Sequence, residues 1–271
     1  MELTTQGFLE LVDGIAPFFL AEPWDNCGLQ AGNRAWPVRR ILVALDVSME
    51  VLEAALRLKA DLVLTHHPLM IHPEKSIDFS IMPGAAVAFS ATNRISLVSA
   101  HTNIDKVNPG LNDYFAARIG LTVTGPLIHG VAKDGENTSM GFGRVGSLER
   151  TVSLRSLAAD LKQCLRSGNV RLVGDPDRFV NKAAVCTGSG ASLIPDFLRT
   201  GAQVFITGDI KYHDARDVEL AGLGLIDVGH FASEALVVDF FSEVLGQAAS
   251  TAGHRLEIFK FDREKDPFVS I

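Results

Sequence analysis

Histidines and carboxylates in this sequence follow apolar segments of the length of a β-strand. Five of them could act together as metal ligands: His66, His67, Asp105, His230 and Glu234. Imidazole nitrogens and carboxylate oxygens gathered at strand ends are typical of an open metal site with mixed ligands. A catalytic zinc usually takes three protein ligands. Because the set is larger than that, it favours two adjacent divalent cations.

The spacing within the set supports this interpretation. His230 and Glu234 are four residues apart, so on a helix they share one face, and Glu234 is our candidate bridge between two cations. His66 and His67 would point to opposite faces of a regular strand, but at a strand end each can bind a different metal. The alternatives are a structural histidine beside a surface histidine, and for Asp105 a turn or capping residue.

Two further histidines, His101 and His213, are candidates for proton transfer. His101 lies at a strand end near Asp105, where it is either a substrate contact or a partner of a metal ligand. His213 either lies in the pocket or caps a surface helix. Asp209 could orient a metal-bound histidine, and the turn 188–190 could receive an anion through its N–H groups.

The elements that must position these residues alternate between strands and helices, which predicts an α/β fold. One βαβ unit is expected from a strand at 40–47, a helix at 48–59 and a strand at 61–65. A second is expected from 183–187, 191–199 and 203–207. In open α/β sheets, ligands bind beyond the carboxyl ends of the strands, which is where both units place their titratable residues.

Other helices are predicted at 8–16, 151–165 and 232–241. Glycine and polar residues are frequent in 125–146, where 134–137 indicates an exposed turn. We therefore expect a metal-binding lobe of residues 1–125 and 225–271, interlinked with a second α/β lobe of residues 126–224.

Composition limits the classes of function. The chain has 271 residues, 47% of them hydrophobic, which is enough for a large core. A net charge of −7 gives no reason to expect nucleic-acid binding. We expect no membrane-spanning segment. Cys27, Cys164 and Cys186 are far apart and are expected to be free thiols, which favours a cytoplasmic protein.

Five segments together resemble the GTP cyclohydrolase I type 2 family, also called the NGG-interacting-factor-three-like proteins. They occur in the family's order and span essentially the whole chain: Trp24–Gln30, Leu64–Leu69, His101–Asp105, Ile206–His213 and Gly229–Glu234. Cys27 departs from the apolar residue that many relatives have there.

The resemblance implies a toroidal homohexamer of two-lobed α/β subunits, in the compact form without the family's mid-chain inserted domain. It also implies a dinuclear metal centre held by the same five residues, His66, His67, Asp105, His230 and Glu234. The two ions are divalent, with zinc, iron, manganese and nickel as the candidates. The family name implies a hydrolase that opens the imidazole ring of GTP and releases formate. The alternative is a protein that binds or delivers metal and catalyses nothing.

Overall fold

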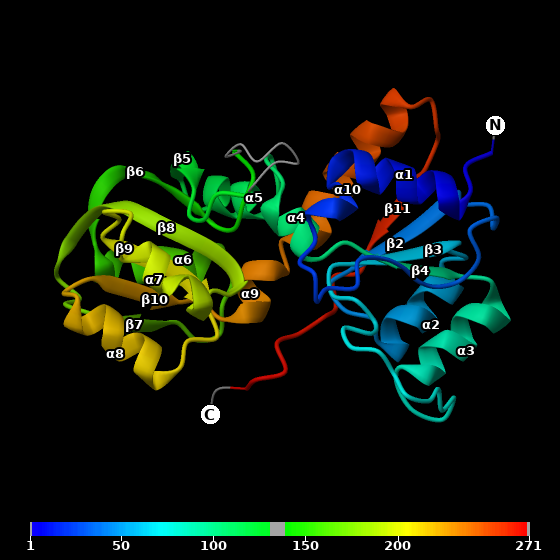
Figure 1. The fold of residues 1–271 in the computed structure, drawn as a ribbon, viewed down its shortest axis with the longest axis horizontal. Helices are drawn as coiled ribbons and strands as arrows, with labels where there is room; N and C mark the ends of the chain where they lie inside the picture. The colour runs from blue at the N-terminus through cyan, green and yellow to red at the C-terminus, as the bar shows by residue number, and fades with distance from the viewer. Residues whose placement is uncertain (1, 131–138, 270–271) are drawn as a thin grey trace. The chain divides into compact units, whose positions relative to one another are not determined.

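The computed structural model describes residues 2–130 and 139–269. The chain divides into two compact units, the first comprising Met1–Ile104 and Val237–Glu264 and the second comprising Asp105–Leu236 and Lys265–Ile271. Each unit has its own sheet with helices on both faces, so the predicted α/β class is confirmed (Figure 1). The turn predicted at 134–137 lies outside the described residues.

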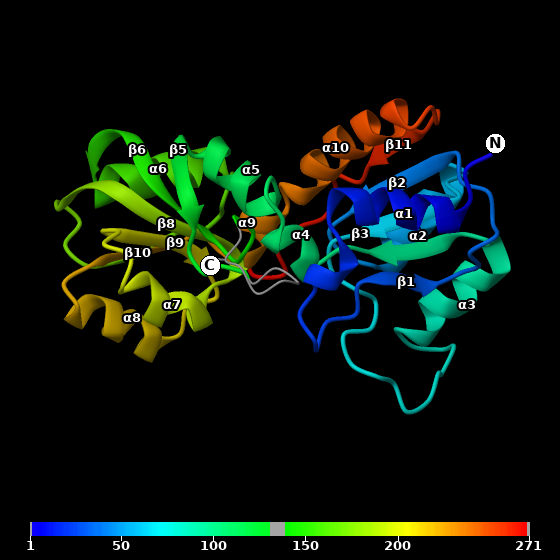
Figure 2. The ribbon, with the colours of Figure 1, turned by 45° about the horizontal axis from the view of Figure 1, so that its top comes forward.

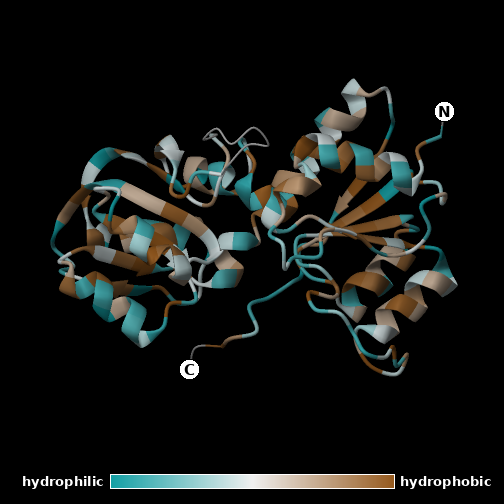
Figure 3. Ribbon diagram, in the orientation of Figure 1, coloured by the Kyte–Doolittle hydropathy of each residue, from teal (hydrophilic) through white to brown (hydrophobic). Residues whose placement is uncertain are grey.

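The first sheet has five strands in the order β1-β4-β3-β2-β11. These strands are β1 (Gly28–Ala31), β2 (Arg40–Ala44), β3 (Leu62–Thr65), β4 (Ser96–Ser99) and β11 (Glu257–Lys260). All neighbours are parallel except β1, which pairs with β4 in the antiparallel direction. Strands β2, β3 and β4 are buried almost throughout, as expected for a parallel sheet covered on both faces. Figure 3 shows them mostly hydrophobic, with polar residues at their ends.

Helices cover both faces of this sheet (Figure 2). They are α1 (Thr5–Ile15), α2 (Met49–Arg57), α3 (Gly84–Asn93) and α10 (Val237–Thr251). Helix α2 packs on β2 and β3 and contacts α3, while α10 packs on β2 and contacts α1. The side chain of Ser48 accepts a hydrogen bond from the Val51 N–H and so caps α2 at the residue where the sequence predicts the helix to begin.

The second sheet has six strands in the order β5-β6-β8-β9-β10-β7. These strands are β5 (Leu121–Pro126), β6 (Arg144–Ser153), β7 (Arg171–Val173), β8 (Phe179–Ser189), β9 (Val204–Gly208) and β10 (Gly224–Asp227). The three central strands, β8, β9 and β10, are parallel, and the outer pairings are antiparallel. Both predicted βαβ units are therefore present, one in each sheet.

Alternate residues of β8 and β9 supply the two hydrophobic cores of the second unit. Val185 and Ile206 face the core formed with α5 (Leu111–Arg118), α6 (Leu154–Cys164) and α9 (His230–Glu234). Ala184 and Phe205 face the opposite core, formed with α7 (Ile194–Phe197) and α8 (Tyr212–Leu220). The sheet is therefore the middle layer of three.

The boundaries of the two units differ from the predicted lobes 1–125 with 225–271 and 126–224. Residues 105–125 join the second unit because β5 pairs with β6, and α5 packs on β5 and β8. Residues 225–236 join it because β10 pairs with β9, and α9 packs on β8. Of the expected ligands, His66 and His67 thus belong to the first unit and Asp105, His230 and Glu234 to the second.

Several predicted helices differ in extent from the observed ones. The helix expected at 8–16 begins earlier, at Thr5. The helix expected at 151–165 begins at Leu154, because residues 151–153 complete β6 and Ser153 is the cap. The helix expected at 191–199 is a 3₁₀ turn, Ala191–Leu193, followed by α7, where Pro195 fits the first turn. The helix expected at 232–241 is two helices, α9 and α10.

The three cysteines are free thiols, as predicted. None of the helices in the described part of the chain is long and apolar enough to cross a membrane.

Arg144 is the largest fully buried side chain in the described part of the chain. Its guanidinium donates to both carboxylate oxygens of Asp113, at 2.7 and 2.6 Å. It also donates to the backbone oxygens of Val107, Gly141 and Gly143 at 2.6–2.8 Å. These bonds satisfy the buried charge and tie the start of β6 to α5 and to the segment before α5.

We predict that Arg144→Met destabilises the protein by about 3–5 kcal/mol, because it leaves Asp113 and three carbonyl groups without their donor. The matched control is Arg150→Met, since Arg150 makes an exposed ion pair with Asp160 at 3.4 Å, which contributes less than about 1 kcal/mol. Urea unfolding followed by circular dichroism measures both. Equal losses for the two variants would contradict the assigned role of Arg144.

Candidate metal centre

The pairing register of the first sheet aligns three chemically important residues at one edge. Ala44 pairs with Thr65, and Thr65 pairs with Ser99. Two residues beyond these positions, the three strands continue into Asp46, His67 and His101. Since the strands are parallel, these residues leave the sheet at the same edge.

His66, His67 and His101 form one cluster at this edge. Their ring centroids are 5.1, 5.0 and 5.5 Å apart. One ring nitrogen from each histidine lies within 4.8 Å of a ring nitrogen of the other two. Sequence analysis assigned proton transfer to His101, whereas the geometry shows that it can also be a third imidazole ligand.

The Nδ1 atom of each of the three histidines has an oxygen partner. For His66 this is the backbone oxygen of Ala100, at 3.1 Å. For His67 it is the carboxylate of Asp46, at 2.8 Å, and for His101 it is the carboxylate of Asp25, at 3.0 Å. Carbonyl and carboxylate oxygens only accept, so Nδ1 carries the proton and a neutral ring has its lone pair on Nε2. This arrangement orients an imidazole for a metal.

Asp25 holds His101 from a loop that precedes β1. Its side chain is fully buried and also accepts hydrogen bonds from Thr102, through the backbone N–H at 3.0 Å and through the hydroxyl. Burial alone would raise the pKa of Asp25, but the hydrogen bonds from His101 and Thr102 outweigh it and hold the pKa well below the usual range. The Asp25 carboxylate is therefore charged wherever the protein is folded near neutral pH.

The adjacent Cys27 is an unreactive thiol. Burial and then the charge of Asp25 raise the pKa of Cys27 to about 12. The thiolate is the nucleophilic form of cysteine, so Cys27 stays protonated near neutral pH. Its single S–H lies within hydrogen-bond distance of Asp25 and Asn103, at 3.1 and 3.2 Å.

In the second unit, His230 and Glu234 lie on α9 as predicted, with His230 Nε2 and Glu234 Oε2 2.7 Å apart. His230 Nδ1 donates to Asp209 at 2.7 Å. Burial alone would lower the pKa of His230, but Glu234 and Asp209 outweigh it and raise the pKa to about 9. Asp209 thus has the orienting position that the sequence suggested.

Asp105 lies on the short helix α4 (Thr102–Lys106) rather than directly at a strand end, and it is buried. Asn112 donates to the backbone oxygen of Asp105 at 3.0 Å and accepts from the Thr187 N–H at 3.0 Å. The Thr187 hydroxyl lies 3.5 Å from the Asp105 carboxylate. These contacts connect Asp105 with the end of β8, next to the position of Glu234.

The backbone of Gly188 packs directly against the carboxylate of Glu234. It has a left-handed φ of +63°, and a methyl group placed on it would lie 2.0 Å from Glu234 Oε1. Its N–H donates to Ser233 on α9 at 2.9 Å. The turn 188–190 therefore positions the carboxylate of Glu234, and its first N–H is already used by Ser233.

His213 lies exposed in the first turn of α8. Its ring packs edge-on against Tyr212, with centroids 5.3 Å apart, and Tyr212 is itself exposed. A role for His213 in proton transfer stays a prediction.

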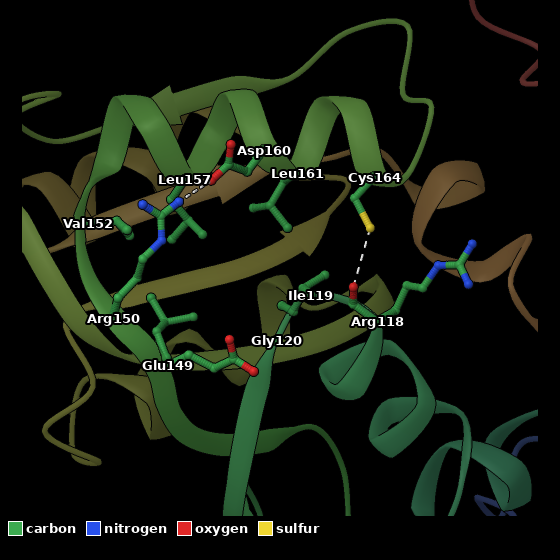
Figure 4. A pocket seen from close by; sticks show the side chains of 11 residues that line it. Arg118, Ile119, Gly120, Glu149, Arg150, Val152, Leu157, Asp160, Leu161 and Cys164 are labelled. Carbon is green, nitrogen blue, oxygen red and sulfur yellow. Dashed lines mark hydrogen bonds and ion pairs between the residues drawn. The ribbon is translucent and has the colours of Figure 1, made fainter.

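The second unit also has a cavity of about 260 Å³, which lies away from Asp105, His230 and Glu234. Arg118, Leu161 and Cys164 are among the residues that line it, and Cys164 donates to the Arg118 backbone oxygen at 3.3 Å (Figure 4). None of the five predicted ligands is among the described residues that line it.

The donor sets fit divalent metal ions. The first unit supplies imidazole nitrogens alone, and the second supplies two carboxylates and one imidazole. Mixed N and O ligands of this kind suit zinc, iron, manganese and nickel. Each histidine predicted as a ligand also has the outer hydrogen bond that metal-bound histidines almost always show.

Comparison with known proteins agrees with the sequence motifs. A family profile described as Duf34/NIF3 (NGG1p interacting factor 3) matches residues 3–267. The chain belongs to this family. The resemblance drawn from the five motifs is therefore confirmed.

Individual relatives match over most of their length. A Clostridium perfringens protein named GTP cyclohydrolase 1 type 2 homolog is 34% identical over 263 residues, covering 97% of this chain and 98% of the relative. A Helicobacter pylori protein named GTP cyclohydrolase 1 type 2 is 32% identical over 238 residues, covering 88% and 89%. The crystal structure of a Staphylococcus aureus hypothetical protein superposes with a TM-score of 0.94 at 26% identity, and coverage is complete for both chains.

Sequence analysis missed two residues that orient the histidines, Asp25 and Asp46. Asp46 could have been found, because it follows β2 just as His67 follows β3. Asp25 lies in the Trp24–Gln30 motif, but nothing in its local sequence indicates a contact with His101, which is 76 residues away.

We predict that Gly188→Ala weakens metal binding at least about tenfold, in the range found when groups that support metal ligands are altered. The added methyl displaces the Glu234 carboxylate. Gly222→Ala is the matched control, because Gly222 has a similar φ of +68° and nothing within 4 Å of an added methyl group. Both variants carry the same backbone strain. Titration with Co²⁺ measures the difference, and equal affinities would show that Gly188 does not support Glu234.

Proposed function

We propose that the protein is a divalent-metal-dependent hydrolase. The observation that carries this proposal is the Nδ1 hydrogen bonding of four histidines, His66, His67, His101 and His230, each to a carbonyl or carboxylate oxygen. Structural histidines need no common tautomer, whereas metal ligands need their lone pair on the atom that faces the ion.

The proposed ligands of a dinuclear centre are His66, His67, Asp105, His230 and Glu234. Their assignment to one centre comes from the family resemblance, and each unit by itself supplies part of the donor set. Bound divalent cations would polarise a substrate oxygen and lower the pKa of a water molecule toward neutrality. We also propose the homohexamer on the basis of the resemblance. We propose a cytoplasmic location because the three cysteines are free thiols.

The chain's own residues would bind and orient the reactants. Asp46 and Asp25 hold His67 and His101 with the proton on Nδ1. Asp209 orients His230, which would have to release its Nε2 proton before it could bind a metal. His101 and His213 are the proposed proton carriers. Lys106, Lys211 and Arg216, close in sequence to predicted site residues, are candidates for pairing with an anionic substrate.

The proposed substrate is GTP, on the basis of the relatives' names. The reaction would open the imidazole ring of GTP by hydrolysis and release formate. We expect metal-loaded protein to produce formate from GTP, and we expect removal of the metal or His66→Ala to abolish this activity. Coupled detection of formate, with metal content measured on the same sample, tests both expectations.

Two other outcomes are informative. Absence of formate from protein that holds about two metal ions per subunit would contradict the GTP assignment and favour the alternative, a protein that binds or delivers metal. Less than one metal ion per subunit after reconstitution would contradict the dinuclear centre itself.

We predict that His213→Ala lowers kcat about 10²- to 10⁴-fold if His213 transfers a proton, while the metal content stays unchanged. Because His213 is exposed in α8, the substitution should not alter stability. His72→Ala is the control, since His72 is also an exposed histidine and has no predicted role in the site. An unchanged kcat for His213→Ala would exclude it from catalysis.

A further inference from the structure

Glu264 is the last residue of the second segment of the first unit, Val237–Glu264. Its carboxylate accepts two backbone hydrogen bonds, Oε2 from the Leu45 N–H and Oε1 from the Asp46 N–H, both at 2.8 Å. More than 200 residues separate the partners along the chain. This carboxylate therefore fixes the peptide groups at which β2 ends.

The segment that Glu264 holds has no regular structure of its own. Residues 45–48 form the bend between β2 and α2. The backbone oxygen of Leu45 accepts from the His67 N–H at 3.0 Å, so contacts on both sides fix the backbone at Leu45 and Asp46. The segment that carries Glu264 is itself held in place by Phe261. The Phe261 side chain is buried, and its N–H donates to the Val43 backbone oxygen at 2.8 Å.

The side chain of Asp46 depends on this backbone. It is 56% exposed, whereas the side chain of His67, to which it is bonded at 2.8 Å, is 20% exposed. An exposed carboxylate on an irregular segment gains little from packing, and its own hydrogen bond to His67 is open to competition from water. The orientation of Asp46 therefore rests on where its backbone is held.

We propose that Glu264 is a positioning residue for the metal ligand His67, acting through the Leu45–Asp46 backbone and the Asp46 carboxylate. The inference rests on the proposed role of His67 as a ligand. Residues that orient metal-bound histidines typically change metal affinity 10- to 100-fold when they are altered. Glu264 contacts the backbone of Asp46 rather than His67 itself, so we expect its substitution to change metal affinity by an amount at the lower end of that range.

The test is a double-mutant cycle on the full-length protein, with the dissociation constant for Co²⁺ and the cobalt absorption spectrum as readouts. We expect Glu264→Gln to weaken Co²⁺ binding about tenfold and to alter the spectrum, because the amide can replace only one of the two acceptor oxygens. In the Asp46→Asn background, the same substitution should have little further effect, since the connection to His67 is already broken.

Glu257→Gln is the matched control. Glu257 is another glutamate of the same C-terminal segment, and it makes an exposed ion pair with Arg40 at 2.9 Å. It should leave Co²⁺ affinity and the spectrum unchanged. Thermal unfolding of every variant separates loss of the metal site from loss of the fold, and Glu264→Asp replaces Glu264→Gln if the latter does not fold.

An equal loss in the wild-type and Asp46→Asn backgrounds would overturn the proposal, because Glu264 would then not act through Asp46. Unchanged affinity in Glu264→Gln would also overturn it. His67→Ala separates this result from the proposed function. If His67→Ala does not weaken Co²⁺ binding, the metal site itself is wrongly assigned, whereas a loss in His67→Ala alone refutes only the role of Glu264.

Discussion

The candidate site depends first on the parallel pairing of strands that end at the same edge of each sheet. In the first unit, the register that pairs Thr65 with Ala44 and Ser99 brings Asp46, His67 and His101 to one edge. In the second unit, pairing of Thr207 with Asp227 places Asp209 close to His230. Backbone hydrogen bonds thus set the positions from which the side chains act, and a register shift would reverse the face of every one of them.

Hydrogen bonds donated by Nδ1 then fix the orientation of each imidazole ring. An imidazole can turn over or change tautomer at little cost when nothing holds it. Asp46, Asp25 and Asp209 remove that freedom, and the backbone oxygen of Ala100 does so for His66. The result is a set of nitrogen donors whose orientation exists before any ion binds, which lowers the entropic cost of binding.

The two units stabilise their candidate ligands differently. The candidate ligands of the first unit follow buried strands, so the parallel sheet restricts their motion. Those of the second unit lie on two short helices, α4 and α9, which have little stability of their own. Contacts with the sheet compensate for this, through Asn112 and Thr187 at Asp105 and through Gly188 at Glu234. The buried guanidinium of Arg144 holds the neighbouring segments together.

The sequence alone determined the α/β class, both βαβ units, the pairing of His230 with Glu234 on one helix face and the family. These depend on local periodicity and on residue order, which one strand or helix displays by itself. Only the tertiary structure decided that residues 105–125 and 225–236 belong to the second unit, and that Asp25 and Glu264 support the site. Those contacts join residues 76–219 positions apart, and the hydrophobic pattern around a carboxylate carries no information about which distant N–H group it will accept from.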